Sequence, residues 1–363
     1  MEKIYRVNEF IRPDICVDAA IKACIDTAKR ETPFPTVVLD GGDYILSEAI
    51  LLPPGITVIL DGCRIKQGDY VADNVFRGDN VIPNPEDPFG MPLSCGKTHD
   101  ITIVGKHGAC ISGPDRNRIG YHPVLDEEQE MVGDFWGWRT ISVSLSNCDR
   151  FEISGIRFEK SRCWTMSFDR CRHGYIHDIE FNTDVKNGDG IDFRSGCHDC
   201  TVENITGVTS DDTVACTALG PFEGRTYPNG KYLYPLEPSL CVGGESREDY
   251  DISHITIKNI HTGGSQHGVI CLAADGHRVY DIHIDGVIEP EGEYWREATV
   301  KIYTGSGYGQ ACREGDMSRI TVENVQSVYA DCPVLCCAPV TDGVIRNIRH
   351  ANGAGGLCDK SSQ

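Results

Sequence analysis

The chain has 363 residues, of which 40% are hydrophobic and 24% charged, so it can bury a large core and is not a disordered protein. Its formal net charge of −20 would repel a phosphate backbone, which argues against nucleic acid as a partner. No segment approaches the ~18 consecutive apolar residues of a membrane span, and the first residues lack the pattern of a secretory signal. We therefore expect a cytoplasmic protein without a membrane partner, whose eighteen cysteines are reduced and buried.

The first predicted element is a short helix. Apolar residues at 17, 21, 24, 25 and 28 form one helical face, which begins beside the acidic Asp18. We expect this helix to cap the open end of the fold, and strands to follow at 36–46 and 56–61. The chain is then one domain of 1–363, with the cap and first coils in 1–60, further coils in 61–350 and a tail in 351–363.

A four-residue phrase recurs in the rest of the chain: Ile or Val, any residue, then Asn, Asp or Gly, then Ile or Val. Most steps between copies are 23 to 27 residues, and longer steps are units with insertions. Ile101 opens an earlier relative of the phrase. The full copies begin at Ile153, Ile176, Val202, Ile257, Ile284, Val322 and Ile345.

Units of this length contain short alternating strands broken by Gly, Asn and Asp, and no useful amphipathic helix. Such units stack as coils in which each covers its neighbour's apolar face. The predicted fold is therefore all-β, a right-handed parallel β-helix. A propeller predicts a period nearer 40 residues and a sandwich predicts strands every 8–12 residues, so both fit less well. Two long irregular stretches, 113–139 and 217–250, interrupt the coils, and loops of that length are usually functional.

The densest acidic cluster falls on consecutive units. Asp212 and His267 each lie 10 residues after the start of their repeat, and Asp189 lies 13 after. Residues at equal phase stack along one face, about 4.8 Å apart per coil, so we expect a column that also brings in Asp211. Crowded carboxylates raise one another's pKa, so one can hold a proton while another is ionised. Glycoside hydrolysis needs such a pair, set roughly 6.5–9.5 Å apart in inverting enzymes.

The chain resembles glycoside hydrolase family 28, the polygalacturonase group of right-handed β-helices, from about 140 to 350. The resemblance implies an inverting hydrolase in which Asp212 is the general acid. It implies that Asp189 and Asp211 hold the attacking water, that His267 supports the acid's proton, and that Lys301 binds a substrate carboxylate or hydroxyl. Four motifs carry it in order: Asn-Gly-Asp-Gly-Ile-Asp at 187–192, Ser-Asp-Asp at 210–212, Gln-His-Gly at 266–268 and Thr-Val-Lys at 299–301.

Further residues are assigned to substrate binding, namely Asn187 in the first motif and the loop aromatics Trp136 and Trp138, whose faces suit sugar rings. The family's arginine is replaced by Thr299, which weakens the case for a long galacturonan chain. An insertion at 217–250 that walls one end of the cleft would favour exo action on short, pectin-like oligosaccharides. No cofactor and no metal is expected, and the oligomeric state is left open.

Several features have plainer interpretations. Asp192 and the turn asparagines are expected to be structural. Asn-Thr-Asp at 182–184 matches part of a family motif but lacks its continuation, so Asp184 is not assigned to the site. Cys197 and Cys200 have the spacing of half a zinc site, without a second pair at suitable distance. Two other functions remain open: a polysaccharide lyase on the same fold, and a non-catalytic carbohydrate-binding solenoid.

Overall fold

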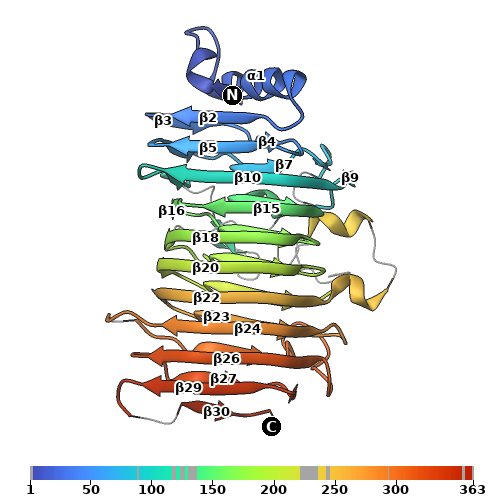
Figure 1. Cartoon of the computed structure of the whole chain (residues 1–363), viewed down its shortest axis with the longest axis vertical. Coiled ribbons are helices and arrows are strands. Elements are labelled where there is room, and N and C mark those ends of the chain that lie inside the picture. Colours follow the sequence, from blue (N-terminus) through green and yellow to red (C-terminus); the bar gives the residue numbers. More distant parts are fainter. Residues whose placement is uncertain are drawn as a thin grey trace.

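The computed structural model describes residues 3–87, 90–116, 120–122, 127–129, 137–220, 236–242, 246–292, 294–353 and 356–361. The chain winds into a right-handed parallel β-helix, with the N-terminus at one end of the stack of rungs and the C-terminus at the other (Figure 1). No helix in the described ranges is long and apolar enough to cross a membrane.

Two long parallel sheets run along the stack. The larger contains β1 (Ile4–Arg6), β2 (Thr36–Asp40), β5 (Thr57–Asp61), β10 (Thr98–Lys106), β15 (Cys148–Ser154), β18 (Arg172–Asn182), β20 (His198–Thr209), β22 (Ile252–Gly264), β24 (Val279–Ile288), β26 (Met317–Ser327) and β28 (Val340–Thr341). Joined to it are β3 (Asp43–Leu46), β6 (Arg64–Gln67), β11 (Cys110–Ser112), β16 (Arg157–Glu159) and β29 (Val344–His350). We call it sheet A.

Sheet B faces sheet A across the core. It contains β4 (Ile50–Leu52), β7 (Phe76–Gly78), β14 (Val143–Ser146), β17 (Met166–Asp169), β19 (Ile191–Arg194), β21 (Val214–Ala218), β23 (Val269–Ala273), β25 (Ala298–Tyr303), β27 (Cys332–Cys336) and β30 (Leu357–Asp359). Two antiparallel pairs, β8 (Val81–Ile82) with β9 (Ser94–Cys95) and β12 (Gly120–His122) with β13 (Glu127–Gln129), lie outside both sheets. The short 3₁₀ helices are η1 (Val7–Glu9), η2 (Trp138–Thr140), η3 (Pro238–Val242) and η4 (Arg247–Tyr250).

The N-terminal end of the stack matches the sequence prediction, whereas at the C-terminal end the coils continue further than predicted. Helix α1 (Val17–Glu31) covers the first rung with a buried face that includes Ile21 and Cys24 (Figure 1). Asp18 lies in its first turn and accepts hydrogen bonds from Ser47, which ties the cap to the first coil. The segment expected to be a tail contains β30, which pairs with β27 and so continues sheet B.

The repeat phrase has a geometric cause. Strand register pairs the first residue of each copy with that of the next, from Ile153 through to Ile345, so these side chains form one buried column. The earlier relative is offset by two residues, because Ile103 rather than Ile101 pairs with Ile153. The third position of each copy has a left-handed backbone, with φ of 58° at Asn204 and 80° at Gly286. Only Gly, Asn and Asp adopt this conformation at low cost, which explains the pattern.

Asn204→Ala is expected to lower the free energy of unfolding by about 1–2 kcal/mol. The asparagine side chain donates to Asp178 at 3.0 Å and accepts from Asn259 at 3.2 Å, and alanine removes both bonds while keeping the strained φ. Asn204→Gly loses the same bonds but relieves the backbone, so it should be the milder change. Urea denaturation of the two variants measures the difference, and equal losses would contradict the backbone explanation.

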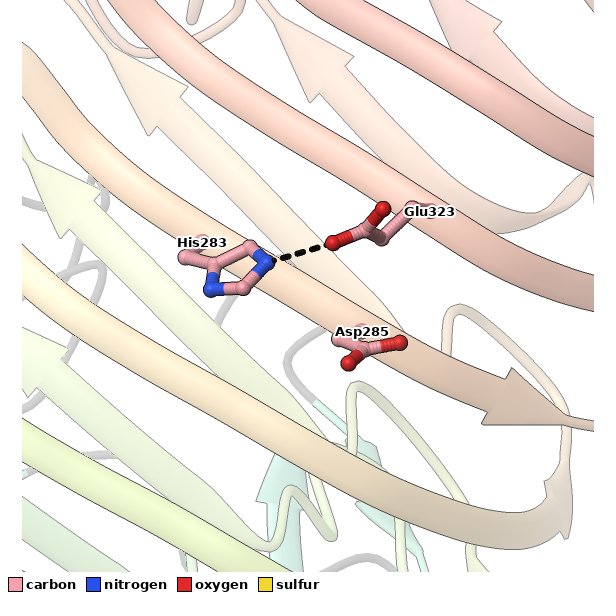
Figure 2. Close-up of side chains that lie close together, drawn as sticks. All are labelled: His283, Asp285 and Glu323. Atoms are coloured by element: carbon pink, nitrogen blue, oxygen red, sulfur yellow. Dashed lines mark hydrogen bonds and ion pairs between the residues drawn. The ribbon is translucent and has the colours of Figure 1, made fainter.

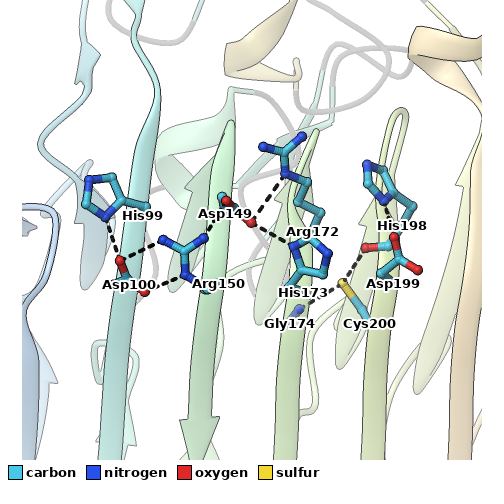
Figure 3. A network of polar contacts seen from close by, with 10 residues as sticks. All are labelled: His99, Asp100, Asp149, Arg150, Arg172, His173, Gly174, His198, Asp199 and Cys200. Atoms are coloured by element: carbon cyan, nitrogen blue, oxygen red, sulfur yellow. Dashed lines mark hydrogen bonds and ion pairs between the residues drawn. The ribbon is translucent and has the colours of Figure 1, made fainter.

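A second left-handed position lies three residues before each phrase and carries charged side chains. Figure 3 shows this column on adjacent rungs, where Arg150 bonds to Asp100 at 2.7 and 2.9 Å and to Asp149 at 2.7 Å. His173 continues the network to Asp149 at 2.7 Å. These groups lie at the surface, where solvent screens each pair, so the column adds little to stability.

The cysteines behave as the composition predicted. All eighteen are unpaired, and most are buried. Cys197 and Cys200 do not form half of a zinc site, because both thiols are buried and bond to the carbonyl oxygens of Phe168 and His198. The His198 ring lies on the exposed side of the strand, where it bonds to Asp199 (Figure 3).

Candidate active site

The acidic residues gather where the chain passes from sheet A into sheet B. Asp189, Asp212 and His267 immediately precede β19, β21 and β23. The amide of Gly190 donates to the carbonyl of Asp212 at 2.9 Å, and that of Thr213 donates to the carbonyl of His267 at 2.9 Å. The three residues therefore stack on successive rungs, as the repeat spacing predicted.

The turn that carries Asp189 depends on two glycines. A Cβ at Gly188 would lie 2.1 Å from the hydroxyl oxygen of Ser210, and one at Gly190 would lie 2.5 Å from the carbonyl oxygen of Thr213. Larger residues would push the next rung away, so the Gly-Asp-Gly sequence is required for Asp189 to lie against its neighbours. Asn187 precedes the turn with φ of 54°, a conformation that asparagine tolerates.

The carboxyl groups converge on a cavity. Oxygen atoms of Asp189, Asp211 and Asp212 lie within 4.8 Å of one another. They line a cavity of about 100 Å³ together with Asn187 and Asp192. The cavity opens on the outer face of sheet B, where its other walls come from Trp164, Arg194, Ala215, Thr217, Leu219, Ile270, Leu272 and Tyr308.

Burial and mutual repulsion change the protonation of this cluster. Burial, and then the neighbouring carboxylates, raise the pKa of Asp189 well above its usual range. The pKa of Asp192 is also raised by burial, against the opposing effect of Arg194. Burial and the charge of Asp212 raise the pKa of Asp211 to about 8. Asp189 Oδ1 and Asp192 Oδ2 are buried without a hydrogen-bond partner, so at least these groups favour the protonated form at neutral pH.

Asp212 has a different environment. Its Oδ1 lies 2.6 Å from His267 Nδ1, and because a carboxylate can only accept, the ring carries the hydrogen on that nitrogen. On the other side of the ring, Nε2 lies 3.7 Å from Glu297, which is bonded to Lys301. A chain of alternating acidic and basic groups thus runs from Asp212 to Lys301 over three rungs.

Of the four residues expected to bind substrate, the structure describes three, and these lie in different surroundings. Asn187 lines the cavity, whereas Lys301 lies further along the stack, beside Ile270 in the strand register. Trp138 is fully buried and its Nε1 donates to the carbonyl of Gly90 at 2.9 Å, so the prediction that it stacks on a sugar is wrong. Trp136 lies outside the described residues.

Other cavity residues were missed by sequence reasoning. Asp192 was expected to be structural, but it is the second residue of β19, and β-strand alternation directs it outward into the cavity while Ile191 and Phe193 enter the core. Trp164 occupies the position of the column one rung before Asp189. The amide of the next residue, Thr165, donates to the Asp189 carbonyl at 2.9 Å, just as Gly190 donates to Asp212. Trp164 lies 11 residues after Ile153, one more than the interval at Asp212 and His267, so counting alone would have pointed to its neighbour Cys163. Tyr308 comes from a loop after β25 and carries no sequence signal.

The described part of the second insertion lies beside the cavity. Glu237 is buried and its Oε1 lies 3.3 Å from both Arg194 Nε and Ser195 Oγ. Leu236 packs with Trp138 in a cluster that also contacts Trp164. The packed cluster therefore bounds the cavity on the side of the earlier rungs, and Trp138 supports that wall from behind.

A larger cavity of about 350 Å³ lies between α1 and the first strands of sheet B. Its charged groups already have partners: Lys29 pairs with Asp79 at 3.0 Å and Arg77 pairs with Asp73 at 2.7 Å. Its buried carboxyl group, Asp73, differs from those of the smaller cavity, because the bonds and charges of Arg139 and Arg77 outweigh burial and lower its pKa. Carboxyl groups with raised pKa values line only the smaller of these two cavities, so we place the chemistry there.

Among the residues that the structure describes, two clusters have ligand atoms close enough to hold a metal ion. One is the trio Asp189, Asp211 and Asp212, where cation binding would require protons to leave two groups of raised pKa. The other, on the outer face of sheet A, contains His283, Asp285 and Glu323 (Figure 2). There Glu323 bonds to His283 at 2.9 Å and Arg346 at 2.6 Å, and Asp285 accepts from Asn324 at 2.6 Å. Because both carboxylates are already bonded, we assign no metal to it.

Comparison with known proteins identifies the fold. Scans of protein-family models and of curated proteins found no match. The structure is similar to an exopolygalacturonase of Thermotoga maritima, with a TM-score of 0.52 and 12% identity over 96% of this chain and 90% of the other. A family 28 exopolygalacturonase of Yersinia enterocolitica gives 0.50 and 12%, covering 99% and 77%. The tailspike of Escherichia coli bacteriophage HK620, in complex with a pentasaccharide, gives 0.56 and 12%, covering 98% and 64%. At this identity the likeness establishes the parallel β-helix alone.

Proposed function

We propose that the protein is a glycoside hydrolase that cleaves short oligosaccharides in the cavity beside β19 and β21. The observation that carries the proposal is the split among four neighbouring carboxyl groups, of which some favour a proton and one is bonded to His267. An acid facing an ionised base is what cleavage of a glycosidic bond requires. The half-buried Trp164 in the wall of the cavity offers an apolar face to a sugar ring.

The raised pKa of Asp211, together with the bond between Asp212 and His267, supports Asp211 as the acid in place of Asp212. Asp211 holds a proton up to pH about 8, and it can donate that proton to the leaving oxygen as the glycosidic bond breaks. Asp212 accepts a proton from the attacking water, whose oxygen bonds to the anomeric carbon, and His267 stabilises the carboxylate. Asp189 and Asp192, protonated and buried, would bond to sugar hydroxyls or to the water.

The stereochemistry rests on two opposing considerations. Family resemblance implies inversion, which usually has carboxyl groups roughly 6.5–9.5 Å apart. The oxygens of the trio lie within 4.8 Å, closer to the ~5–5.5 Å of retaining enzymes. We propose inversion on the family resemblance, with the attacking water on the side of Asp212. Proton NMR of the first product gives the anomer, and retention would overturn this step.

The wall built by Leu236, Trp138 and Trp164 supports exo action. A cavity that is closed on one side accepts a chain end and a few sugars beyond it, and a long polymer cannot pass through. Digestion of a labelled hexasaccharide is expected to release products from one end only. Early appearance of products of intermediate length would show endo action.

The pH profile of kcat/KM should have an alkaline limb near pH 8. Asp211 acts only when protonated, so activity is expected to be high below its pKa and to decline as the pH rises through about 8. Asp211→Asn should remove this limb from the residual activity. A limb that persists unchanged in the variant would assign the acid to another residue.

A panel of α-linked oligosaccharides, with products followed by NMR and ultraviolet absorbance, separates the proposal from its rivals. Hydrolysis gives reducing ends without absorbance. A polysaccharide lyase would generate a new C=C bond that absorbs in the ultraviolet, and its activity would be lost with a chelator if the carboxylate trio held calcium. Binding without cleavage of any oligosaccharide would identify a carbohydrate-binding solenoid.

A further inference from the structure

We propose that the site takes uncharged sugars and discriminates against uronic acids, because the protein's own carboxylates occupy the cations beside the cavity. This inference rests on the proposed function and names the substrate class of the same site. It departs from the pectin-like substrate that the sequence resemblance implies.

Lys301, the residue expected to bind a substrate carboxylate, is already bonded to a carboxylate of the protein. Its ammonium bonds at 2.5 Å to Oε2 of Glu297, which lies four residues earlier, directly before β25. The same ammonium lies 4.7 Å from the centre of the Tyr303 ring, and the side chain is only 14% exposed. A uronate would have to displace an intramolecular partner that is held at high effective concentration.

Glu297 also faces the catalytic column. Its Oε2 lies 3.7 Å from His267 Nε2, so one carboxylate contacts both basic groups on this side of the cavity. Burial raises the pKa of Glu297, but the bond from Lys301 and the nearby charges lower it overall, so the group is ionised at neutral pH. A substrate carboxylate placed here would meet a like charge and no free cation.

The remaining described cations near the cavity are similarly engaged. Arg194 pairs with the buried Glu237 and lies 4.7 Å from the centre of the Trp164 ring. Arg296 lies behind the turn of His267, where its Nε donates to the carbonyl of Gly264. Its other two guanidinium nitrogens have no hydrogen-bond partner, but the side chain is completely buried and so out of reach of a substrate. The charge of the exposed Lys186 acts on Asp211, where it opposes but does not outweigh the rise in the pKa of that carboxyl group.

The charge of the cavity itself points the same way. The whole chain carries −20 and the ionised Glu297 lies beside the cavity, so a polyuronate would be repelled both at a distance and in contact. Hydroxyl groups of a neutral sugar can donate to these carboxyls and accept from those that are protonated. Neutral substrates therefore satisfy the buried polar atoms Asp189 Oδ1 and Asp192 Oδ2 without adding charge.

The test uses matched oligosaccharides of equal length and linkage, one series of α-linked galactose and one of α-linked galacturonic acid. The wild-type protein is expected to prefer the neutral series by at least roughly tenfold in kcat/KM, since a like-charge contact costs on the order of 1.4 kcal/mol or more. Glu297→Gln releases Lys301 and should shift the uronate-to-neutral ratio of kcat/KM toward the uronate by a similar factor. Glu291→Gln removes an equal charge from the same connection at an exposed position and should leave the ratio unchanged.

A wild-type preference for the uronate would overturn this inference while leaving hydrolysis intact. If neither series is cleaved, binding of both to Asp211→Asn is measured by calorimetry. Tighter binding of the neutral series supports the inference even though the hydrolase proposal then fails. Equal binding, tighter uronate binding or no binding overturns it. If the ratio shifts equally in Glu297→Gln and Glu291→Gln, net charge alone explains the shift, and the inference is also overturned.

Discussion

Asp211→Asn is expected to lower kcat by roughly 10²–10⁴-fold, the contribution that a positioned general acid makes. Asparagine has nearly the same shape but no proton to give to the leaving oxygen, and it removes a carboxyl whose pKa is raised to about 8 by burial and by Asp212. Relief of that repulsion should leave stability equal or slightly higher. Steady-state kinetics and thermal melting on the same preparations measure both effects.

The matched control is Asp184→Asn, an exposed aspartate in the same connection between β18 and β19, which should retain wild-type kinetics. Asp212→Asn is expected to lose a similar amount of turnover because it removes the base and its bond to His267. The two losses differ in their pH dependence, since only the Asp211 variant should lose the alkaline limb. Near-normal turnover in either aspartate variant would refute the assignment.

Phe168→Ala is expected to lower the free energy of unfolding by about 3–5 kcal/mol. Phe168 is fully buried, and its ring centre lies 4.8 Å from that of Phe151 on the same rung and 5.7 Å from that of Phe193 on the next rung. Alanine leaves a cavity that the paired strands on both sides prevent from collapsing. Urea denaturation followed by tryptophan fluorescence measures the loss.

Two comparisons make this result specific. Phe168→Leu keeps much of the volume and should cost well under half as much. Phe34→Ala removes an equal ring from a side chain that is 56% exposed, and should change stability by less than about 1 kcal/mol. A similar loss at Phe34 and Phe168 would show that stacking in the coil does not dominate stability.

The solenoid was predictable because its constraints are local and repeat. Each rung needs apolar side chains that alternate inward and a left-handed position that Gly, Asn and Asp tolerate best. The phrase that begins at Val202 or Ile257 therefore follows from the structure of its own rung. Register between rungs is then set by counting. For that reason the alignment of Asp189, Asp212 and His267 followed from sequence spacing.

The errors arose where side chains depend on segments outside the repeat. Trp138 looked like an exposed loop aromatic, but its burial depends on packing with Leu236, almost a hundred residues later. Asp192 looked like a turn residue because the start of β19 was not apparent from the motif. The pairing of Lys301 with Glu297 required the ammonium to turn back along its own strand, which spacing alone does not predict.

By itself, then, the sequence determined the coil, its period and the residues that face one another along the stack. The reason is that the residues of each unit set its own backbone conformation and strand alternation. Only the tertiary structure decided which carboxyl keeps its proton, which cations are already paired and which side of the cavity is closed. Those properties depend on desolvation and on charges brought together from distant rungs, and both vary with every side chain that packs around them.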